Sequence, residues 1–153
     1  MPQSQSASAD NLIFSSGTII ERQDGRQVWE LHAQSIETNL STRKARLFEV
    51  SGIFYNENEN ENSGKVVIAA ETAILDTDTK NIELNDNVKI TGHGATLDAP
   101  HARWDGSNRR FSAFGGINMQ REDIVITGES IEASPDLEEV VVKGRAKIVK
   151  GGN

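Results

Sequence analysis

Residues 66–90 of the 153-residue chain read VVIAAETAILDTDTKNIELNDNVKI, and this stretch decides the fold because it recurs. Residues 95–119, ATLDAPHARWDGSNRRFSAFGGINM, repeat its order of apolar and turn-forming residues after 29 positions, and a third copy follows at the same interval. Ala70, Ala99 and Gly128 are equivalent in the three copies, and each comes after an apolar run. A fixed period of this length is typical of chains built from repeated supersecondary units.

Turn-forming residues occur at one place in each copy, between two apolar segments. They are DTDTK at 76–80, DGSN at 105–108, SPD at 134–136 and, in an earlier and longer copy, NLST at 39–42. These residue types favour tight turns, so each copy is predicted to be a strand, a hairpin turn and a strand. Asp24-Gly25 predicts a further hairpin between strands at 18–22 and 27–32.

Apolar residues recur at even separations within each predicted strand, which places them on one face of a sheet. The chain has 14 Ile and 10 Val against 8 Leu, and β-branched side chains favour strands over helices. We therefore predict an all-β fold, a continuous antiparallel meander of strand–turn–strand units. A solenoid of parallel rungs is the alternative, because such folds also have fixed repeat lengths; the hairpin turns favour antiparallel pairing.

One face of the predicted sheet is apolar, and we take it as the candidate binding surface. Its larger residues are Trp29, Leu31, Leu47, Ile68, Leu84, Ile90, Leu97, Trp104, Phe111, Ile117, Met119, Ile126, Val142 and Ile148. A single sheet must bury such a face. It becomes a packed core if the fold closes, or a groove for acyl chains if the fold stays partly open. Small residues on this face, such as Ala70 and Ala102, fit either interpretation.

Composition and motifs exclude several classes of function. A net charge of −7 argues against nucleic-acid binding, which needs a basic patch. We find no catalytic motif and expect neither an enzyme nor a cofactor. A metal site at His93, His101 and Asp98 is conceivable, but histidines in surface turns are the simpler interpretation. Asp76-Thr77-Asp78 lacks the glycine and the distant glutamate of a calcium loop and is better explained as a hairpin turn.

The ends of the chain differ from its middle. Residues 1–16 are expected to be a polar, disordered linker, residues 17–150 the folded domain and residues 151–153 a tail. Residues 56–64, NENENENSG, are expected to form an exposed loop. The sequence contains no run of about 20 apolar residues, the length needed for a membrane helix.

Two features resemble the LptC family of lipopolysaccharide transport proteins. One is the run DGRQVWELHA at 24–33, and the other is the repeated cycle that is clearest at 70–90. The resemblance covers residues 18–150 and extends to the wider OstA-like group, which includes LptA. It implies a twisted, open antiparallel β-jellyroll on the periplasmic face of the inner membrane of a diderm bacterium. It also implies an N-terminal anchor helix, which is missing from this sequence.

The resemblance further implies a role and partners. Such proteins accept lipopolysaccharide from an inner-membrane ABC transporter, hold its lipid A acyl chains in the apolar groove, and pass it to an LptA-like bridge protein. The transporter's membrane subunits would meet the N-terminal edge, and the LptA-like protein the C-terminal edge. The edge residues would be Thr18, Ile20 and Arg22, and Ala146, Ile148 and Lys150 respectively. Unprotected edges could also pair two copies of the chain.

Other functions stay open on the sequence alone. The chain could be an LptA-like soluble bridge protein, a structural β-repeat protein that binds no ligand, or a sugar-processing or sugar-binding all-β protein. A sugar site would need exposed aromatic residues, yet the chain has only eight aromatic residues, and Trp29, Trp104 and Phe111 fall on the apolar face.

Overall fold

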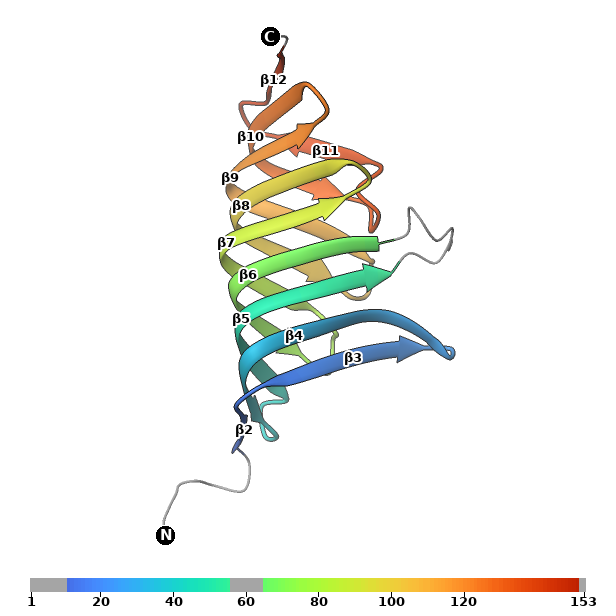
Figure 1. Cartoon of the computed structure of the whole chain (residues 1–153), viewed down its shortest axis with the longest axis vertical. Coiled ribbons are helices and arrows are strands. Elements are labelled where there is room, and N and C mark those ends of the chain that lie inside the picture. Colours follow the sequence, from blue (N-terminus) through green and yellow to red (C-terminus); the bar gives the residue numbers. More distant parts are fainter. Residues whose placement is uncertain (1–10, 56–64, 152–153) are drawn as a thin grey trace.

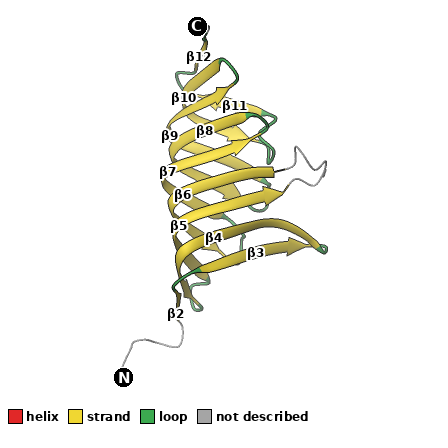
Figure 2. Cartoon of the chain, viewed as in Figure 1, coloured by secondary structure: helices red, strands yellow, loops and turns green. Residues whose placement is uncertain are grey.

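The computed structural model describes residues 11–55 and 65–151, which form one 11-stranded sheet. The expected loop at 56–64 lies outside the described residues. The strands are β2 (Asn11–Phe14), β3 (Gly17–Gln23), β4 (Arg26–Asn39), β5 (Lys44–Tyr55), β6 (Lys65–Asp76), β7 (Ile82–Gly92), β8 (Ala95–Asp105), β9 (Arg110–Arg121), β10 (Ile124–Ala133), β11 (Val140–Lys143) and β12 (Lys147–Lys150). No helix occurs among these residues (Figure 2).

The strands form an antiparallel meander, as the repeat predicts. From β4 to β10 each strand pairs with the next strand in sequence, and every pairing is antiparallel. The predicted hairpin turns lie where the sequence places them, including the tight turn at Asp24 and Gly25 between β3 and β4. The parallel solenoid is therefore the wrong alternative.

A line of irregular pairings folds this sheet over on itself. Register shifts occur between Ala69 and Thr72 in β6, between Asn85 and Val88 in β7, and at matching places in β8 and β10. Bulges of this kind bend a strand and increase its twist. Figure 1 shows the consequence, since each long strand crosses from one layer of the molecule into a second layer behind it. We call this line of bends the crease.

The two layers have different edge strands. Beside the first halves of β4 and β10 run β3 and β12, which are the edges of the first layer. Beside the other halves of β4 and β10 run β2 and β11, the edges of the second layer. The N-terminal edge of the roll thus consists of β2 and β3, and its C-terminal edge of β11 and β12 (Figure 1).

Cross-strand partners on the inner face form continuous rows along the roll, because directly paired residues point to the same side of a sheet. The row in the first layer is Ile19, Leu31, Gly52, Ile68, Ile90, Leu97, Met119, Ile126 and Ile148. The row in the second layer is Phe14, Ile36, Leu47, Ala73, Leu84, Ala102, Ala113, Ile131 and Val142. Both rows extend from one edge of the roll to the other.

The strand β2 corrects the expected domain boundary. Residues 11–14 lie in the segment 1–16 that was expected to be a linker, yet they pair with Ile36–Asn39 of β4. The segment was interpreted as a linker because most of its residues are polar. It ends, however, in a short apolar run, Leu12-Ile13-Phe14, which can extend the sheet. Residues 1–10 lie outside the described part of the chain.

Candidate functional site: the apolar interior and the free edges

The space between the two layers contains most of the residues predicted to line a groove. Those at most 3% exposed are Trp29, Leu31, Leu47, Ile68, Leu84, Ile90, Leu97, Trp104, Phe111, Ile117 and Met119. They belong to a single hydrophobic cluster, against which Ile126 and Val142 pack from partly buried positions. Ile148, at the C-terminal edge, is 69% exposed. The structure thus gathers the predicted residues into one apolar interior, which is filled by their own side chains.

Four aromatic side chains connect the layers inside this interior. Trp29 and Phe54 come from the first layer, and Trp104 and Phe111 come from the second. The ring of Phe54 lies 4.8 Å from Trp104 and 5.0 Å from Phe111, centroid to centroid, and the latter two rings are also 4.8 Å apart. Tilted and edge-to-face contacts at these distances stabilise a core beyond simple burial.

Sequence reasoning missed Phe54. The crease in β5 falls at Glu49, which has a φ of 58° and directs no side chain into the interior. After this extra residue the inward positions change from Ala45 and Leu47 to Val50 and Phe54. Even spacing from the start of the strand therefore gives the wrong face beyond the crease.

The layers also meet on the side opposite the crease, where the hairpin turns lie; we call this side the mouth. The ammonium group of Lys80, in the turn of the second layer, lies 3.3 Å from the carboxylate of Glu21 in β3 of the first layer. Farther along, Nη2 of Arg121 in the first layer donates a hydrogen bond of 2.8 Å to the carbonyl oxygen of Leu137 in the β10–β11 turn. Polar contacts thus close the mouth over the apolar interior.

Exposed apolar residues gather at the two edges of the roll. The N-terminal edge has Leu12, Ile13, Phe14 and Ile20, and the C-terminal edge has Val141, Ile148 and Val149. The predicted edge residues Thr18, Ile20 and Arg22 lie on β3, Ile148 and Lys150 lie on β12, and Ala146 directly precedes β12. Because each of these strands pairs with one neighbour in the described chain, its other side presents backbone donors and acceptors.

A polar network lies on the outer face beside the N-terminal edge. His32 is within hydrogen-bond distance of Thr18 Oγ1, at 2.9 Å, and of Glu30 Oε2, at 2.7 Å. The Tyr55 hydroxyl donates to Glu30 Oε1 at 3.1 Å, and the Gln27 amide donates to the same oxygen. The hydrogen bond from His32 is the largest influence on the Glu30 carboxyl. Together with the bonds from Tyr55 and Gln27 it outweighs desolvation and lowers the pKa of Glu30.

This network predicts a loss of stability in acid. The pKa of Glu30 is lowered from its usual 4.5, so folding favours the charged carboxylate. Its contribution is present above pH 4.5 and is lost as the pH falls through the lower folded pKa. We expect Glu30→Gln, whose side chain does not titrate, to lose less stability than the parent between about pH 5 and about pH 3. These two pH values lie on either side of the usual pKa of a glutamate side chain. Melting temperatures followed by circular dichroism measure this, and parallel curves for the two proteins would contradict it.

The residues considered for a metal or calcium site make ordinary side-chain and turn contacts in the structure. His101 Nδ1 is 2.9 Å from Asn85 Oδ1, and its ring stacks on Phe114. Within residues 11–55 and 65–151, no group of three His, Cys, Asp or Glu side chains could hold a metal ion. The carboxylate of Asp76 accepts hydrogen bonds from the backbone N–H groups of Asp78 and Thr79, which is the geometry of a hairpin turn.

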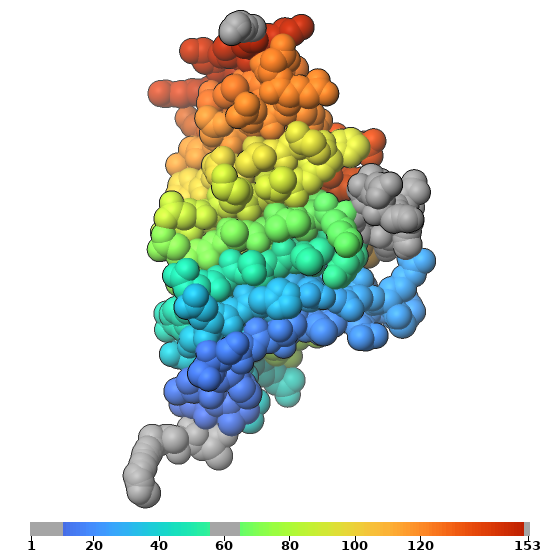
Figure 3. Space-filling view, in the orientation of Figure 1, coloured from blue at the N-terminus to red at the C-terminus, as the bar shows by residue number. Residues whose placement is uncertain are grey.

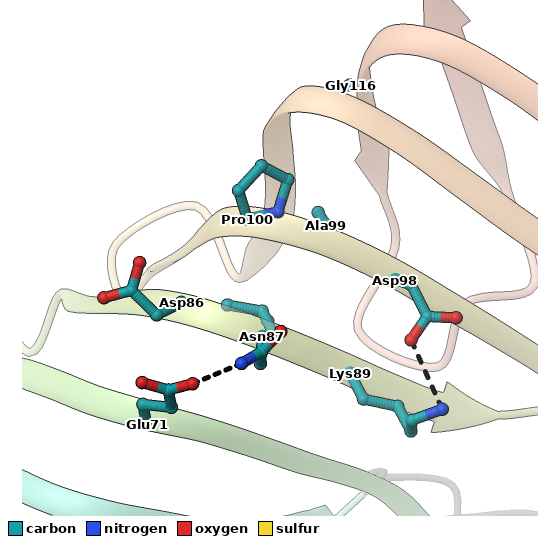
Figure 4. A pocket seen from close by; sticks show the side chains of 9 residues that line it. Glu71, Asp86, Asn87, Lys89, Asp98, Ala99, Pro100 and Gly116 are labelled. Atoms are coloured by element: carbon teal, nitrogen blue, oxygen red, sulfur yellow. Dashed lines mark hydrogen bonds and ion pairs between the residues drawn. The ribbon is translucent and has the colours of Figure 1, made fainter.

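A cavity of about 660 Å³ lies at the crease, and its lining combines charged side chains such as Glu71 and Asp86 with apolar ones such as Val88 and Ala99. Figure 4 shows its charged walls, where Lys89 pairs with Asp98 at 3.3 Å and the Asn87 amide donates to Glu71. Pro100 is part of its lining. The lining of this cavity contains none of the residues predicted to form the acyl-chain groove. Figure 3 shows the outer surface of the first layer, which faces away from the apolar interior between the two layers.

Fold and interior together define the class of this protein. An antiparallel sheet folded along a crease, with a continuous apolar inner face and free strands at both ends, is a twisted open β-jellyroll domain. In the described part of the chain, no helix is long and apolar enough to cross a membrane.

A family model described as lipopolysaccharide-assembly, LptC-related, matches residues 2–150, and the chain belongs to this LptC family. The resemblance noted in the sequence is thereby confirmed, and the protein is a periplasmic lipopolysaccharide transport protein. No curated protein matches the chain. Among solved structures it is similar to LptH, described as the LptA-homologous periplasmic component of the lipopolysaccharide transport device from Pseudomonas aeruginosa. The identity is 10% and the TM-score 0.38, over 93% of this chain and 95% of that one.

Proposed function

We propose that the interior takes up the acyl chains of lipid A and that the chain relays lipopolysaccharide along its inner face. The observation that carries this proposal is the uninterrupted inner row from Ile19 to Ile148, which connects the two free edges. A relay needs one apolar path with both ends accessible. Ile148, at the end of this row, supplies an apolar side chain exposed to an incoming partner.

The energetics favour acyl chains as the ligand. Burying a methylene contributes about 0.8 kcal/mol, so a chain of about twelve methylenes contributes roughly 10 kcal/mol. Binding requires the two layers to move apart, because side chains fill the interior of the free protein. The second-layer row includes Ala73, Ala102 and Ala113, whose methyl side chains are buried in the interior. A methyl group makes fewer van der Waals contacts than a larger side chain, so contacts with a lipid replace those of an alanine at a smaller cost.

We infer the partners from the family resemblance and assign one to each free edge. The N-terminal edge, β2 and β3, would face the membrane subunits of an inner-membrane ABC transporter, and the C-terminal edge, β11 and β12, would pair with an LptA-like protein. Strand addition at a free edge provides affinity through backbone hydrogen bonds. The location would be the periplasmic face of the inner membrane, with an N-terminal helix as anchor. The apolar row would then continue from one protein into the next.

Photo-crosslinking tests the lipid-binding proposal. A photoreactive amino acid is placed at Leu84 or Ile117, which face the interior, and at Glu83 or Lys143, which face outward, and each protein is irradiated with lipopolysaccharide. We expect adducts from the two interior positions. Adducts confined to the outward positions, or none, would contradict the proposal. The complete packing of the interior favours a structural β-repeat protein as the second candidate, and that candidate predicts no adducts at any of the four sites.

A proline in β12 tests the C-terminal edge. Gly151 N donates to the carbonyl of Asp123, so the alternating pattern of an antiparallel pair turns the N–H of Ile148 away from β10. Ile148→Pro therefore removes a donor from the free edge without removing a bond within the sheet. We expect it to weaken binding of an LptA-like protein at least about tenfold, the equivalent of one strong hydrogen bond. Titration calorimetry measures this, with Ile148→Val as the matched control. Unchanged affinity would show that β12 is not the docking strand.

A further inference from the structure

The β10–β11 turn, residues 134–139, inserts a side chain into the apolar interior. Leu137 is fully buried at 0% exposure and belongs to the hydrophobic cluster, although it comes from a turn and not from a strand. Its φ is 63°, in the left-handed region that a leucine rarely adopts. Such a conformation persists only where the surroundings impose it. Leu137 thus fills interior space in a strained position at the mouth of the roll.

The turn is organised largely by its own hydrogen bonds. The Ser134 hydroxyl donates to Asp136 Oδ1 at 2.8 Å, the backbone N–H of Glu138 donates to the same oxygen at 3.0 Å, and Leu137 N donates to the Ser134 carbonyl at 3.0 Å. Burial acts to raise the pKa of Asp136, but the bonds from Glu138 and Ser134 outweigh it and the pKa is lowered. Because these bonds lie within the turn, the turn would keep its own conformation if its contacts with the rest of the roll, which include an attraction between Asp136 and His93, were broken.

Arg121 links this turn to the first layer. It ends β9, pairs with Ala95 and Ile124, and extends across the mouth to the Leu137 carbonyl. Its Nε atom is buried and donates to no acceptor among the described residues. A guanidinium has its donors arranged to bind two oxygens of a phosphate or carboxylate at once. Arg121 therefore holds a neutral carbonyl with one donor while another donor is left without a partner.

A second cation extends the same row toward the C-terminal edge. Lys150 pairs with Ile124, which pairs with Arg121, so the two cations face the same side of the first layer. At the N-terminal end of this inner row stands Glu21, paired with Trp29. Glu21 is paired with Lys80, whereas the Arg121 guanidinium donates to a neutral carbonyl and makes no ion pair with any residue that the structure describes. Electrostatic attraction would favour the phosphate end of an amphiphile near Arg121.

Resting on the proposed function, we propose that Arg121 is a latch that a lipid phosphate releases. In the free protein Arg121 holds the β10–β11 turn through the Leu137 carbonyl, and Leu137 occupies acyl-chain space. When the phosphate of lipid A reaches the mouth, the guanidinium exchanges the carbonyl for the phosphate oxygens. The turn then withdraws, and an acyl chain takes the place of Leu137. Arg121 is a specificity-determining residue in this scheme, and Leu137 is the element that closes the site.

Adduct yields with two lipids test the latch. Proteins with a photoreactive residue at Ile117 are irradiated with diphosphorylated lipid A or with fully dephosphorylated lipid A. The parent is expected to prefer the phosphorylated lipid about tenfold or more. Arg121→Gln is expected to lose this preference, Arg121→Lys to retain part of it, and Leu137→Ala to give higher yields with both lipids. Arg103→Gln, on the outer face of β8, is the control and should behave as the parent.

The outcomes separate the latch from the lipid-binding proposal. If the parent gives interior adducts without preferring phosphate, or if Arg121→Gln keeps the full preference, the latch is overturned while lipid binding stands. If the parent gives no adducts with either lipid, both proposals are overturned. Circular dichroism of each variant establishes that the sheet is intact. Because Arg121→Lys retains a charge at the same position, its partial preference would assign the effect to charge and not to altered folding.

Discussion

Replacing Ile90 with lysine is expected to destabilise the chain by about 5 kcal/mol or more, which would unfold a domain of ordinary stability. Ile90 is fully buried between Ile68 and Leu97 in the first-layer row. The substitution removes about 2 to 3 kcal/mol of apolar burial. It also places an ammonium group where only apolar side chains surround it, which adds several kcal/mol because no partner compensates the charge.

Thr91→Lys provides a matched control. Thr91 is the next residue in β7, and its side chain points to the outer face and is exposed. The same lysine there should change the free energy of unfolding by less than about 0.5 kcal/mol, as for most surface substitutions. Urea denaturation followed by circular dichroism gives both values. Equal stability of the two variants would mean that water already enters the interior in the free protein.

Replacing Phe111 with alanine is the second large effect we expect, a loss of about 3 to 5 kcal/mol. The ring of Phe111 contacts both Phe54 and Trp104, so its removal leaves a cavity between the layers as well as lost burial. The remaining aromatic side chains belong to two different layers and cannot close that cavity without bending the sheet. The loss in the free energy of unfolding should therefore lie in the upper part of this range.

Phe114→Ala separates this effect from a general effect of losing an aromatic residue. Phe114 lies in the same strand, β9, but it is 46% exposed on the outer face and stacks on His101 at 5.6 Å. Its removal should cost no more than about 1 kcal/mol. Thermal and urea denaturation of the two variants measure the difference. Equal losses would contradict the conclusion that contacts within the aromatic cluster stabilise the packing of the two layers.

Much of the fold could be predicted from the repeat. The 29-residue period places Ile90 and Met119 at equivalent positions, and the structure puts both in the same inner row. The turn residues at Asp76 and Asp105 begin hairpin turns, as local turn chemistry requires. Such features depend on short-range rules, namely the two-residue period of strands and the hydrogen bonding of Asp side chains to nearby backbone.

The features that sequence reasoning missed depend on long-range pairing. The crease needs bulges at residues such as Asp86 and Gly116, which have positive φ values. Asp and Gly adopt such values in ordinary turns as well, so their presence alone does not place a bulge within a strand. The irregularity at Glu49 shifts the inward positions of β5 from odd to even residue numbers, and Phe54 was missed for that reason. In β7 and β9 the inward positions keep the same parity across the crease. Leu137 was missed because a turn residue is not expected to enter a core. The distance between the two layers could not be predicted from the sequence either, because the same pattern of apolar residues suits a packed core and an acyl-binding groove.

Nuclear magnetic resonance of methyl groups tests the central claim most directly. The apolar side chains that fill the interior of the free protein are proposed to be the surface that binds lipid. In a sample with labelled Ile, Leu and Val methyl groups, acyl protons of lipid A should give nuclear Overhauser effects to Ile90, Leu84 and Ile117. Exposed Val67 and Ile20 should give none. Effects at Val67 and Ile20 without any at the three buried residues would show that lipid stays outside the roll, and would contradict the account.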